Sequence, residues 1–332
     1  MKRVTLAVPV YNEEEAIGPF RAAIEELRDE LARRFEGGVR LDVLFVNDGS
    51  SDSTVERILS WRQDTTDVAL IDLTRNFGKE AALTAALIEA EGDAVVPIDV
   101  DLQDPPALIA DMVELWLNGA ELVLARRTDR SEDSLAKRST ARWFYRLHNS
   151  LAKIQLPENV GDFRLMDRSV VDAVNALPEN RRVMKGIFAW VGFTPVFVDY
   201  KRPVRSAGKS SFSFWKLWLL AIESITSFSA VPLIMWTYIG LMISMLSLAY
   251  ACFIVARTFV FGVDVPGYAS LLTGILFLGG IQILGIGVLG EYVSSIYSEV
   301  KRRPTYLVRT RHGLSPEGSE TAKTTNSKQR TR

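Results

Sequence analysis

Residues 94–106 read AVVPIDVDLQDPP, so a short apolar run is followed at once by two closely spaced carboxylates and a Pro-Pro pair. The run from Ala94 to Ile98 is apolar and largely β-branched, which predicts a buried strand. The segment Pro106–Leu117 carries apolar residues at helical spacing and predicts a helix. A strand that passes into a helix in this way is the repeating unit of sheets that are covered by helices.

The same alternation repeats through the first two hundred residues. Further β-branched runs predict strands at Val4–Val10, Leu41–Val46, Val68–Leu73 and Leu122–Ala125. The intervals between the runs predict helices at Glu13–Phe35, Ser53–Arg62 and Lys79–Ala90. This alternation predicts an α/β fold in which a mostly parallel sheet is flanked by helices.

Composition narrows the classes of function. The chain has 332 residues and a formal net charge of −1, so it lacks the excess of Lys and Arg that neutralises nucleic-acid phosphates, and we expect no nucleic-acid partner. Cys252 is the only cysteine and cannot form an intramolecular disulfide. The only histidines are His148 and His312, which leaves no Cys/His cluster with the spacing of a zinc site.

Two runs without charged residues predict a membrane hairpin in the second half of the chain. They cover Ser224–Ala256 and Val265–Gly290, and each exceeds the roughly 20 apolar residues that cross a bilayer. Basic residues flank the pair of runs at Lys201, Arg202, Arg205, Lys209, Lys216, Lys301, Arg302 and Arg303. The positive-inside rule therefore predicts that both flanks, the α/β domain and both termini lie in the cytoplasm.

The glycines of the second charge-free run match a nucleotide-binding spacing by accident. Gly285-x-Gly287-x-x-Gly290 fits the dinucleotide fingerprint, but no strand precedes it and it lies inside the predicted membrane helix. Small residues in that setting favour close packing of two helices.

The segment before the hairpin has the pattern of a helix in the membrane interface. Between Phe214 and Ile225 the aromatic and aliphatic residues recur at helical spacing, while Lys216 and Glu223 share another face. A helix packed on the α/β domain is the alternative. The predicted division is 1–205 for the α/β domain, 206–229 for the interfacial helix, 230–293 for the hairpin, and 294–332 for a C-terminal segment that is disordered after about residue 315.

Candidate ligand-binding residues follow the predicted strands, and in open α/β sheets ligands bind beyond the carboxyl ends of the strands. Asp99 and Asp101 follow the fourth strand, and side chains two residues apart on an extended segment point to the same side. Two such carboxylates suit a hard divalent cation that also binds substrate phosphates. For so short a motif, a turn with a helix cap is the alternative.

Five motifs occur in order along the chain: VPVYNEE at 8–14, VNDGSSDST at 46–54, RNFGKEAAL at 75–83, DVDLQDPP at 99–106 and GDFRLMDR at 161–168. Together with the hairpin they resemble the family-2 glycosyltransferases of the polyprenyl-phosphate branch, and most closely the bactoprenol (undecaprenyl-phosphate) glucosyltransferase group. The resemblance runs from Met1 to about Val308. It implies a GT-A-type fold and a multi-pass protein of the inner (plasma) membrane with a cytoplasmic catalytic domain.

The resemblance also assigns residues to the donor side. The residues that match donor-binding positions, chiefly those for the nucleoside, are Pro9, Tyr11, Glu13, Asp48 and Lys79. Asp99 and Asp101 match the pair that holds the metal and the diphosphate, with Gln103 beside them, which implies Mg²⁺ or Mn²⁺ as cofactor. Asp162 matches the carboxylate often treated as the family's base, and it could instead orient Arg164 or the hydroxyls of the sugar.

The charge of the acceptor indicates which residues would bind it. A lipid monophosphate is largely ionised at neutral pH because its second pKa is about 6, so it needs positioning by cations more than it needs a base. The candidate cations are Arg126, Arg138, Arg164, Arg205 and Lys209. Arg126 joins Asp101 and Asp162 in the expected catalytic set. Relatives often carry Ser at the position of Ala141 and Lys at that of Ser211, so the individual phosphate ligands stay open.

The resulting hypothesis is an enzyme that transfers glucose from UDP-glucose to undecaprenyl (polyprenyl) phosphate with inversion, in contact with the bilayer. Within the same reaction class, a mannosyl or aminoarabinosyl lipid is the alternative product, because no motif encodes the pocket contacts that select a sugar. From a different class, a catalytically silent membrane sensor of nucleotide-sugars is the alternative. Whether the chain forms a homo-oligomer stays open.

Overall fold

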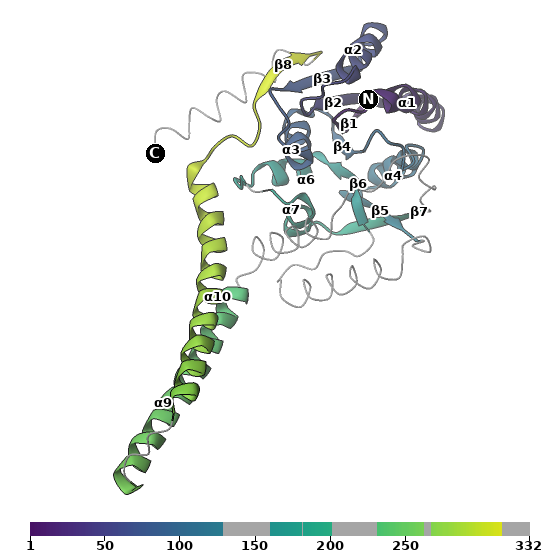
Figure 1. Ribbon diagram of the computed structural model, residues 1–332. Coiled ribbons are helices and arrows are strands. Elements are labelled where there is room, and N and C mark those ends of the chain that lie inside the picture. Colours follow the sequence, from purple (N-terminus) through teal and green to yellow (C-terminus); the bar gives the residue numbers. More distant parts are fainter. Residues whose placement is uncertain (129–159, 181, 201–230, 262–266, 314–332) are drawn as a thin grey trace, which may run out of the picture. The chain divides into compact units, whose positions relative to one another are not determined.

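The computed structural model describes residues 1–128, 160–180, 182–200, 231–261 and 267–313 (Figure 1). The chain divides into two compact units. The sheet unit contains the described residues up to 200 together with 303–313, and the helix unit contains those from 231 to 302.

One eight-stranded sheet forms the centre of the sheet unit. Its strands are β1 (Lys2–Val10), β2 (Val39–Asn47), β3 (Val68–Leu73), β4 (Ala94–Pro97), β5 (Leu122–Arg127), β6 (Val160–Asp167), β7 (Pro195–Tyr200) and β8 (Val308–His312). They lie in the order β7-β5-β6-β4-β1-β2-β3-β8. The pairs β1–β2, β1–β4, β2–β3 and β5–β7 are parallel, whereas β6 runs antiparallel to both β4 and β5. The predicted fold class, a mostly parallel sheet flanked by helices, is confirmed.

Helices cover the sheet in the intervals that the sequence predicts. They are α1 (Glu14–Arg34), α2 (Thr54–Asp64), α3 (Lys79–Glu89), α4 (Leu108–Leu117), α6 (Arg168–Asn175) and α7 (Met184–Trp190). Helix α1 packs against α2 and α4, while α3 packs on β1, β2 and α6. The buried residues of α1 recur every three or four positions, which gives the helix one apolar face toward the sheet.

Three aromatic side chains from separate elements are among the largest fully buried side chains of this core. Phe20 of α1, Phe45 of β2 and Trp61 of α2 are almost fully buried. Their rings meet edge to face, with centroids 5.7 Å apart for Phe45 and Trp61 and 6.0 Å apart for Phe20 and Phe45. This geometry is favourable for aromatic pairs and fixes α1 and α2 against the same strand.

Strand β8 was not predicted from the sequence. It pairs antiparallel with β3 at the edge of the sheet, and the N–H of Thr74 donates to the carbonyl of Leu307 at 2.9 Å. Arg311 pairs with Glu89 at 2.7 Å. The stretch VRTRH has too few apolar residues to predict a buried strand, but charged side chains are typical of an edge strand. The expected disorder after about residue 315 concerns residues outside the described part of the chain.

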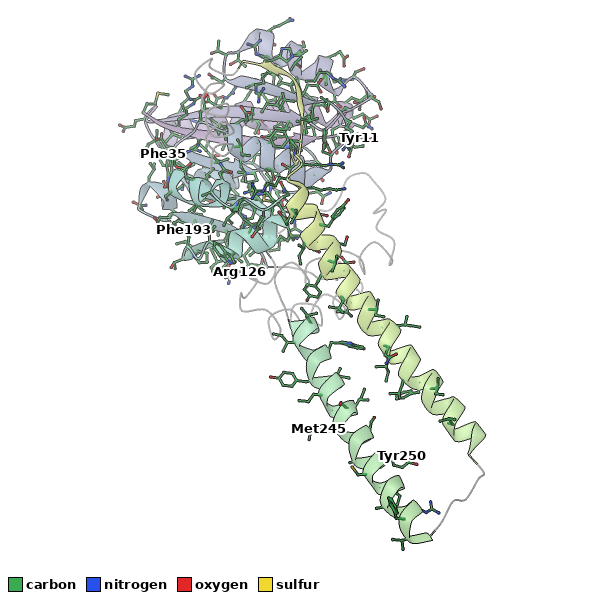
Figure 2. The ribbon with its side chains drawn as sticks, turned by 90° about the vertical axis from the view of Figure 1, so that its left-hand side faces the viewer. Tyr11, Phe35, Arg126, Phe193, Met245 and Tyr250 are labelled. Atoms are coloured by element: carbon green, nitrogen blue, oxygen red, sulfur yellow. The ribbon has the colours of Figure 1, made fainter. Side chains whose placement is uncertain are left out.

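The helix unit consists of α9 (Val231–Phe261) and α10 (Tyr268–Lys301), which contact each other. Gly285 of α10 is buried, and a Cβ atom there would lie 2.0 Å from Nε1 of Trp236, so close packing explains this glycine. Large apolar side chains such as Met245 and Tyr250 project from α9, each 65% exposed (Figure 2).

Only part of the predicted hairpin meets a length and hydropathy test for membrane spans. Among the described residues, Phe277–Lys301 is long and apolar enough to cross a membrane, and a shorter apolar stretch covers Leu233–Ser247. Apart from Gly267, which precedes α10, the described residues of both charge-free runs are helical. The number of membrane crossings and the topology stay predictions. The predicted interfacial helix at 206–229 lies outside the described residues.

Gly49 holds two loops of the sheet unit in close contact. It follows β2 with a φ of +75°, a conformation that glycine adopts without steric cost. A Cβ atom at this position would lie 2.6 Å from the carbonyl carbon of Arg75 and 2.7 Å from the amide nitrogen of Asn76. The loop after β2 and the loop after β3 can approach each other this closely only because residue 49 has no side chain.

We predict that Gly49→Ala destabilises the protein more than Gly119→Ala. Both glycines have positive φ, which costs an alanine about 1–2 kcal/mol, but no heavy atom lies within 4 Å of a Cβ atom at Gly119. Chemical denaturation of the two variants measures the free energy of unfolding. Equal losses would contradict the close contact between the loops at Gly49.

Candidate active site

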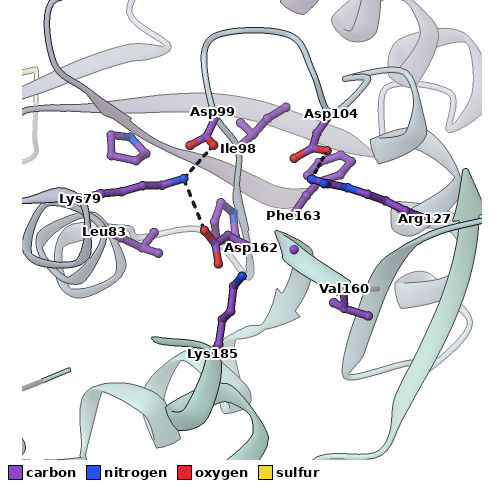
Figure 3. A pocket seen from close by; sticks show the side chains of 13 residues that line it. Lys79, Leu83, Ile98, Asp99, Asp104, Arg127, Val160, Asp162, Phe163 and Lys185 are labelled. Carbon is purple, nitrogen blue, oxygen red and sulfur yellow. Dashed lines mark hydrogen bonds and ion pairs between the residues drawn. The ribbon is translucent and has the colours of Figure 1, made fainter. Parts of the chain in front are cut away.

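A cavity of about 240 Å³ opens at the carboxyl ends of the central strands (Figure 3). Because β6 runs antiparallel to β4, its first residues reach the same edge as the last residues of β1, β4 and β5. The lining residues are Pro9, Lys79, Leu83, Pro97, Ile98, Asp99, Asp104, Arg127, Val160, Gly161, Asp162, Phe163 and Lys185. Of the residues predicted from the sequence, the structure thus brings Pro9, Lys79, Asp99 and Asp162 together.

Lys79 joins two carboxylates across the cavity. Its ammonium lies 2.7 Å from Oδ2 of Asp99 and 3.4 Å from Oδ2 of Asp162 (Figure 3). Burial opposes the charged form of Lys79, but the two carboxylates outweigh it and raise its pKa. Burial also opposes ionisation of Asp162, yet Lys79, Lys185 and Arg164 hold the pKa of Asp162 below its usual value. Asp162 is therefore ionised at neutral pH and is a weak proton acceptor.

Asp99 and Asp101 lie close enough to Glu13 to affect its ionisation. Burial raises the pKa of Glu13, and the negative charges of Asp101 and Asp99 raise it further. Burial raises the pKa of Asp99, and Lys79 partly offsets that effect. Asp101 is exposed and accepts a hydrogen bond from the backbone N–H of Gln103 at 3.2 Å.

The donor set at Asp99 and Asp101 fits a cation that shares its coordination with a substrate. Within the described part of the chain, no group of three or more His, Cys, Asp and Glu side chains is arranged to hold a metal. Mg²⁺ is commonly held by one or two carboxylates together with substrate phosphates and water, and a pair of Asp residues meets that need. Asp99 would have to serve both this cation and Lys79.

Asp48 shapes the loop that carries Lys79. Its side chain is buried and accepts hydrogen bonds from the N–H groups of Phe77, at 2.7 Å, and Gly78, at 2.9 Å. Burial raises the pKa of Asp48, although both N–H groups act in the opposite direction. The carboxylate that the resemblance assigns to the nucleoside is thus engaged with the β3–α3 loop. Tyr11, from the same predicted set, is 48% exposed and does not line the cavity.

Neighbouring arginines at the end of β5 have different surroundings. Arg126 forms a two-pronged pair with Asp199, at 2.7 and 2.9 Å, and does not line the cavity. Arg127 lines it and donates to the hydroxyl of Tyr200 at 3.0 Å. Successive side chains of a strand point to opposite sides, so only one of the two can face the cavity. The sequence analysis selected Arg126 and missed Arg127, because the pattern of β5 does not show which residue faces inward.

Asp104 and Tyr200 anchor the loop that carries Asp101. Asp104 is 7% exposed and accepts hydrogen bonds from the hydroxyl of Tyr200 and from Arg127. Burial and the carboxylate of Asp104 raise the pKa of Tyr200 to about 12, so the phenol keeps its proton. The sequence offered no signal for this contact, because the two residues are 96 positions apart.

Arg164 is buried and donates hydrogen bonds to the backbone of the first residues of β6. It is 5% exposed, and its guanidinium donates to the carbonyls of Gly161, at 2.7 Å, and Asp162, at 3.3 Å. Burial lowers its pKa to about 10. Its guanidinium also stacks on the ring of Phe188, 4.1 Å from the centroid. The structure therefore uses this predicted phosphate ligand to hold Asp162. The other predicted ligands, Arg138, Arg205 and Lys209, lie outside the described residues.

Glu80 connects α3 to α7 beside the cavity. Its carboxylate accepts a hydrogen bond from the N–H of Met184, the first residue of α7, at 3.2 Å. The protein around Glu80 removes part of its hydration, and with the negative charge of Asp162 this raises the pKa of Glu80 to about 7. The next residue of α7 is Lys185, which lines the cavity. Neither Glu80 nor Lys185 was selected from the sequence.

The family model "Glycosyl transferase family 2" matches residues 5–174. The chain is 50% identical to "Bactoprenol glucosyl transferase" of Shigella phage SfII over 314 residues, which is 95% of this chain and 100% of that one. It is 48% identical to "Prophage bactoprenol glucosyl transferase homolog" of Escherichia coli (strain K12), covering 92% of this chain and 98% of that one. It is 46% identical to "Uncharacterized glycosyltransferase sll0501" of Synechocystis, with 94% and 96% covered.

We predict that Glu80→Gln stabilises the protein at neutral pH and leaves its stability unchanged in acid. The carboxylate ionises at about pH 4.5 in the unfolded chain and at about pH 7 in the folded protein, so the wild type loses stability as the pH rises through that range. Glutamine keeps an acceptor for the Met184 N–H and carries no charge.

Melting temperatures between about pH 4 and pH 8 test this prediction. The variant should gain on the wild type as the pH rises and keep a constant lead above about pH 7. Glu26→Gln, on the exposed face of α1, controls for the change in net charge. If the difference in melting temperature between Glu80→Gln and the wild type does not vary with pH, the pKa of Glu80 is not raised in the folded protein.

Proposed function

The chain belongs to glycosyltransferase family 2, and on that premise we propose that it transfers glucose from UDP-glucose to undecaprenyl (polyprenyl) phosphate. Two proteins named as bactoprenol glucosyl transferases are half identical to it over nearly their whole length, which supports a glucosyl transfer to a lipid carrier. The observation that carries the proposal within the structure is the cavity in which Lys79 joins Asp99 to Asp162.

The donor end of the site is the edge formed by Asp99 and Asp101. These two carboxylates would hold Mg²⁺ or Mn²⁺, which when bound neutralises the charge that develops on the departing diphosphate. Pro9 lines the cavity from β1, and Glu13 lies near the carboxylate pair, so both remain candidates for contacts with the donor. Arg127 keeps Asp104 in place behind them.

The reaction is a single displacement at the anomeric carbon. An oxygen of the lipid phosphate attacks that carbon from the face opposite the leaving group, a new C–O bond forms, and the bond to the nucleoside diphosphate breaks with its electron pair leaving on the diphosphate. The configuration inverts. Because the attacking oxygen is already ionised, no proton has to be removed. The lowered pKa of Asp162 makes it a poor base. We therefore assign Asp162 the role of orienting the sugar or nearby cations.

The helix unit provides the membrane contact that a lipid acceptor requires. The stretch Phe277–Lys301 is long enough to span a bilayer, and α9 exposes apolar side chains such as Met245 and Tyr250. Soluble proteins rarely expose so many large apolar residues along one element. In the proposed topology α9 and α10 cross the membrane as a hairpin, and the basic residues that flank them lie in the cytoplasm.

The proposed donor and acceptor can be tested together. Purified full-length protein is incubated with undecaprenyl phosphate, Mg²⁺ or Mn²⁺ and each of a panel of labelled nucleotide-sugars, and label is counted in the organic phase. We expect label from UDP-glucose and its loss when the cation is chelated. Preferential transfer of mannose or aminoarabinose would replace the proposed sugar, and no transfer from any donor would favour a silent sensor.

We predict that Asp101→Asn lowers transfer by about 100-fold or more, because removing a group that stabilises transition-state charge has effects of that size. Asp101 is exposed and makes a single local hydrogen bond, so the variant should keep its fold. Asp29→Asn, on the exposed face of α1, is the control and should transfer at the wild-type rate. Normal turnover by a folded Asp101→Asn protein would exclude the carboxylate from the donor site.

A further inference from the structure

The cavity contains three cationic side chains, and they differ in their partners. Lys79 is shared between Asp99 and Asp162. Arg127 is held by Tyr200 and Asp104. Lys185 lines the same cavity, and within the described part of the chain its ammonium forms no ion pair at 4 Å or less. Lys185 is therefore the cation of this cavity that is available to a ligand.

Helix α7 holds Lys185 in place. The helix is anchored at its first residue by the hydrogen bond from the Met184 N–H to Glu80, and it packs on β6. Met184, Ile187 and Phe188 are buried, whereas Lys185 is exposed. Figure 3 shows the Lys185 side chain rising from α7 toward Asp162. Helix α7 thus fixes the position of Lys185 in the chain, while the residue itself stays exposed.

The charge of the cavity favours an anionic ligand at this point. Asp162 is an ionised carboxylate near the start of β6. Lys79 has the largest effect in keeping the pKa of Asp162 low, and the charge of Lys185 has the next largest. An acceptor phosphate carries a charge of about −1.5 to −2 at neutral pH, so an unbalanced Asp162 would repel it. The ammonium of Lys79 is already shared between Asp99, at 2.7 Å, and Asp162, at 3.4 Å, whereas Lys185 has no such ion pair among the described residues.

We propose that Lys185 binds the phosphate group of the acceptor and holds it beside Asp162. The ligand class is a phosphomonoester, and the proposal rests on the proposed transfer to a lipid phosphate. The ammonium donates hydrogen bonds to oxygens of the phosphate that do not react, keeps its proton throughout, and leaves one oxygen free to attack the anomeric carbon. The bonds that form and break are those of the single displacement described above.

Three variants test this assignment in the full-length protein. Lys185→Gln removes the charge, Lys185→Arg keeps it, and Lys2→Gln removes a lysine from the opposite, amino-terminal edge of the sheet. We measure KM for undecaprenyl phosphate, KM for a short-chain polyprenyl phosphate, KM and Kd for UDP-glucose, and the melting temperature.

Losing one charge-assisted contact should raise KM for both phosphates by about 10- to 100-fold in Lys185→Gln. Donor Kd and melting temperature should stay at the wild-type values, Lys185→Arg should recover most of the acceptor affinity, and Lys2→Gln should match the wild type. An equal shift with both chain lengths identifies the phosphate as the group that is bound.

Contrary outcomes are distinct. If the wild type transfers sugar but acceptor KM is unchanged in Lys185→Gln, the assignment of Lys185 fails and the proposed function stands. A loss of donor affinity with unchanged acceptor KM would move Lys185 to the donor side and also overturn the assignment. If the wild type transfers nothing to any polyprenyl phosphate, the proposed function fails and the assignment fails with it.

Discussion

The bridge from Lys79 to Asp99 and Asp162 is the interaction on which the site depends. Asp99 follows β4 and Asp162 lies near the start of β6, and because these strands are antiparallel neighbours the two charges meet at one edge of the sheet. Like charges held at one edge repel each other, and accordingly burial raises the pKa of Asp99 and the charge of Asp162 raises it further. A single ammonium between them offsets that repulsion and fixes both side chains.

The loops around the bridge position the ammonium of Lys79. Asp48 accepts the N–H groups of Phe77 and Gly78 and thereby sets the start of α3, where Lys79 is the first residue. Gly49 allows the loop after β3 to pass close by. Most of this apparatus lies in backbone contacts, which explains how residues that touch no cavity can still decide its shape.

The C-terminal strand connects the two units through the chain itself. Helix α10 ends at Lys301, and β8 begins at Val308, where it pairs with β3. The loop that follows β3 leads directly to Lys79. The segment that follows the apolar helix therefore also completes the edge of the sheet.

The sequence by itself determined the strand and helix order of residues 1–128, since apolar periodicity and strand-end carboxylates are local signals. It also determined the family, through five motifs in a fixed order. Only the tertiary structure decided that Arg127 and not Arg126 enters the cavity, that Arg164 is buried, and that Lys185 faces Asp162. Those facts depend on which side of a strand faces inward and on contacts between distant residues, and no local pattern encodes either.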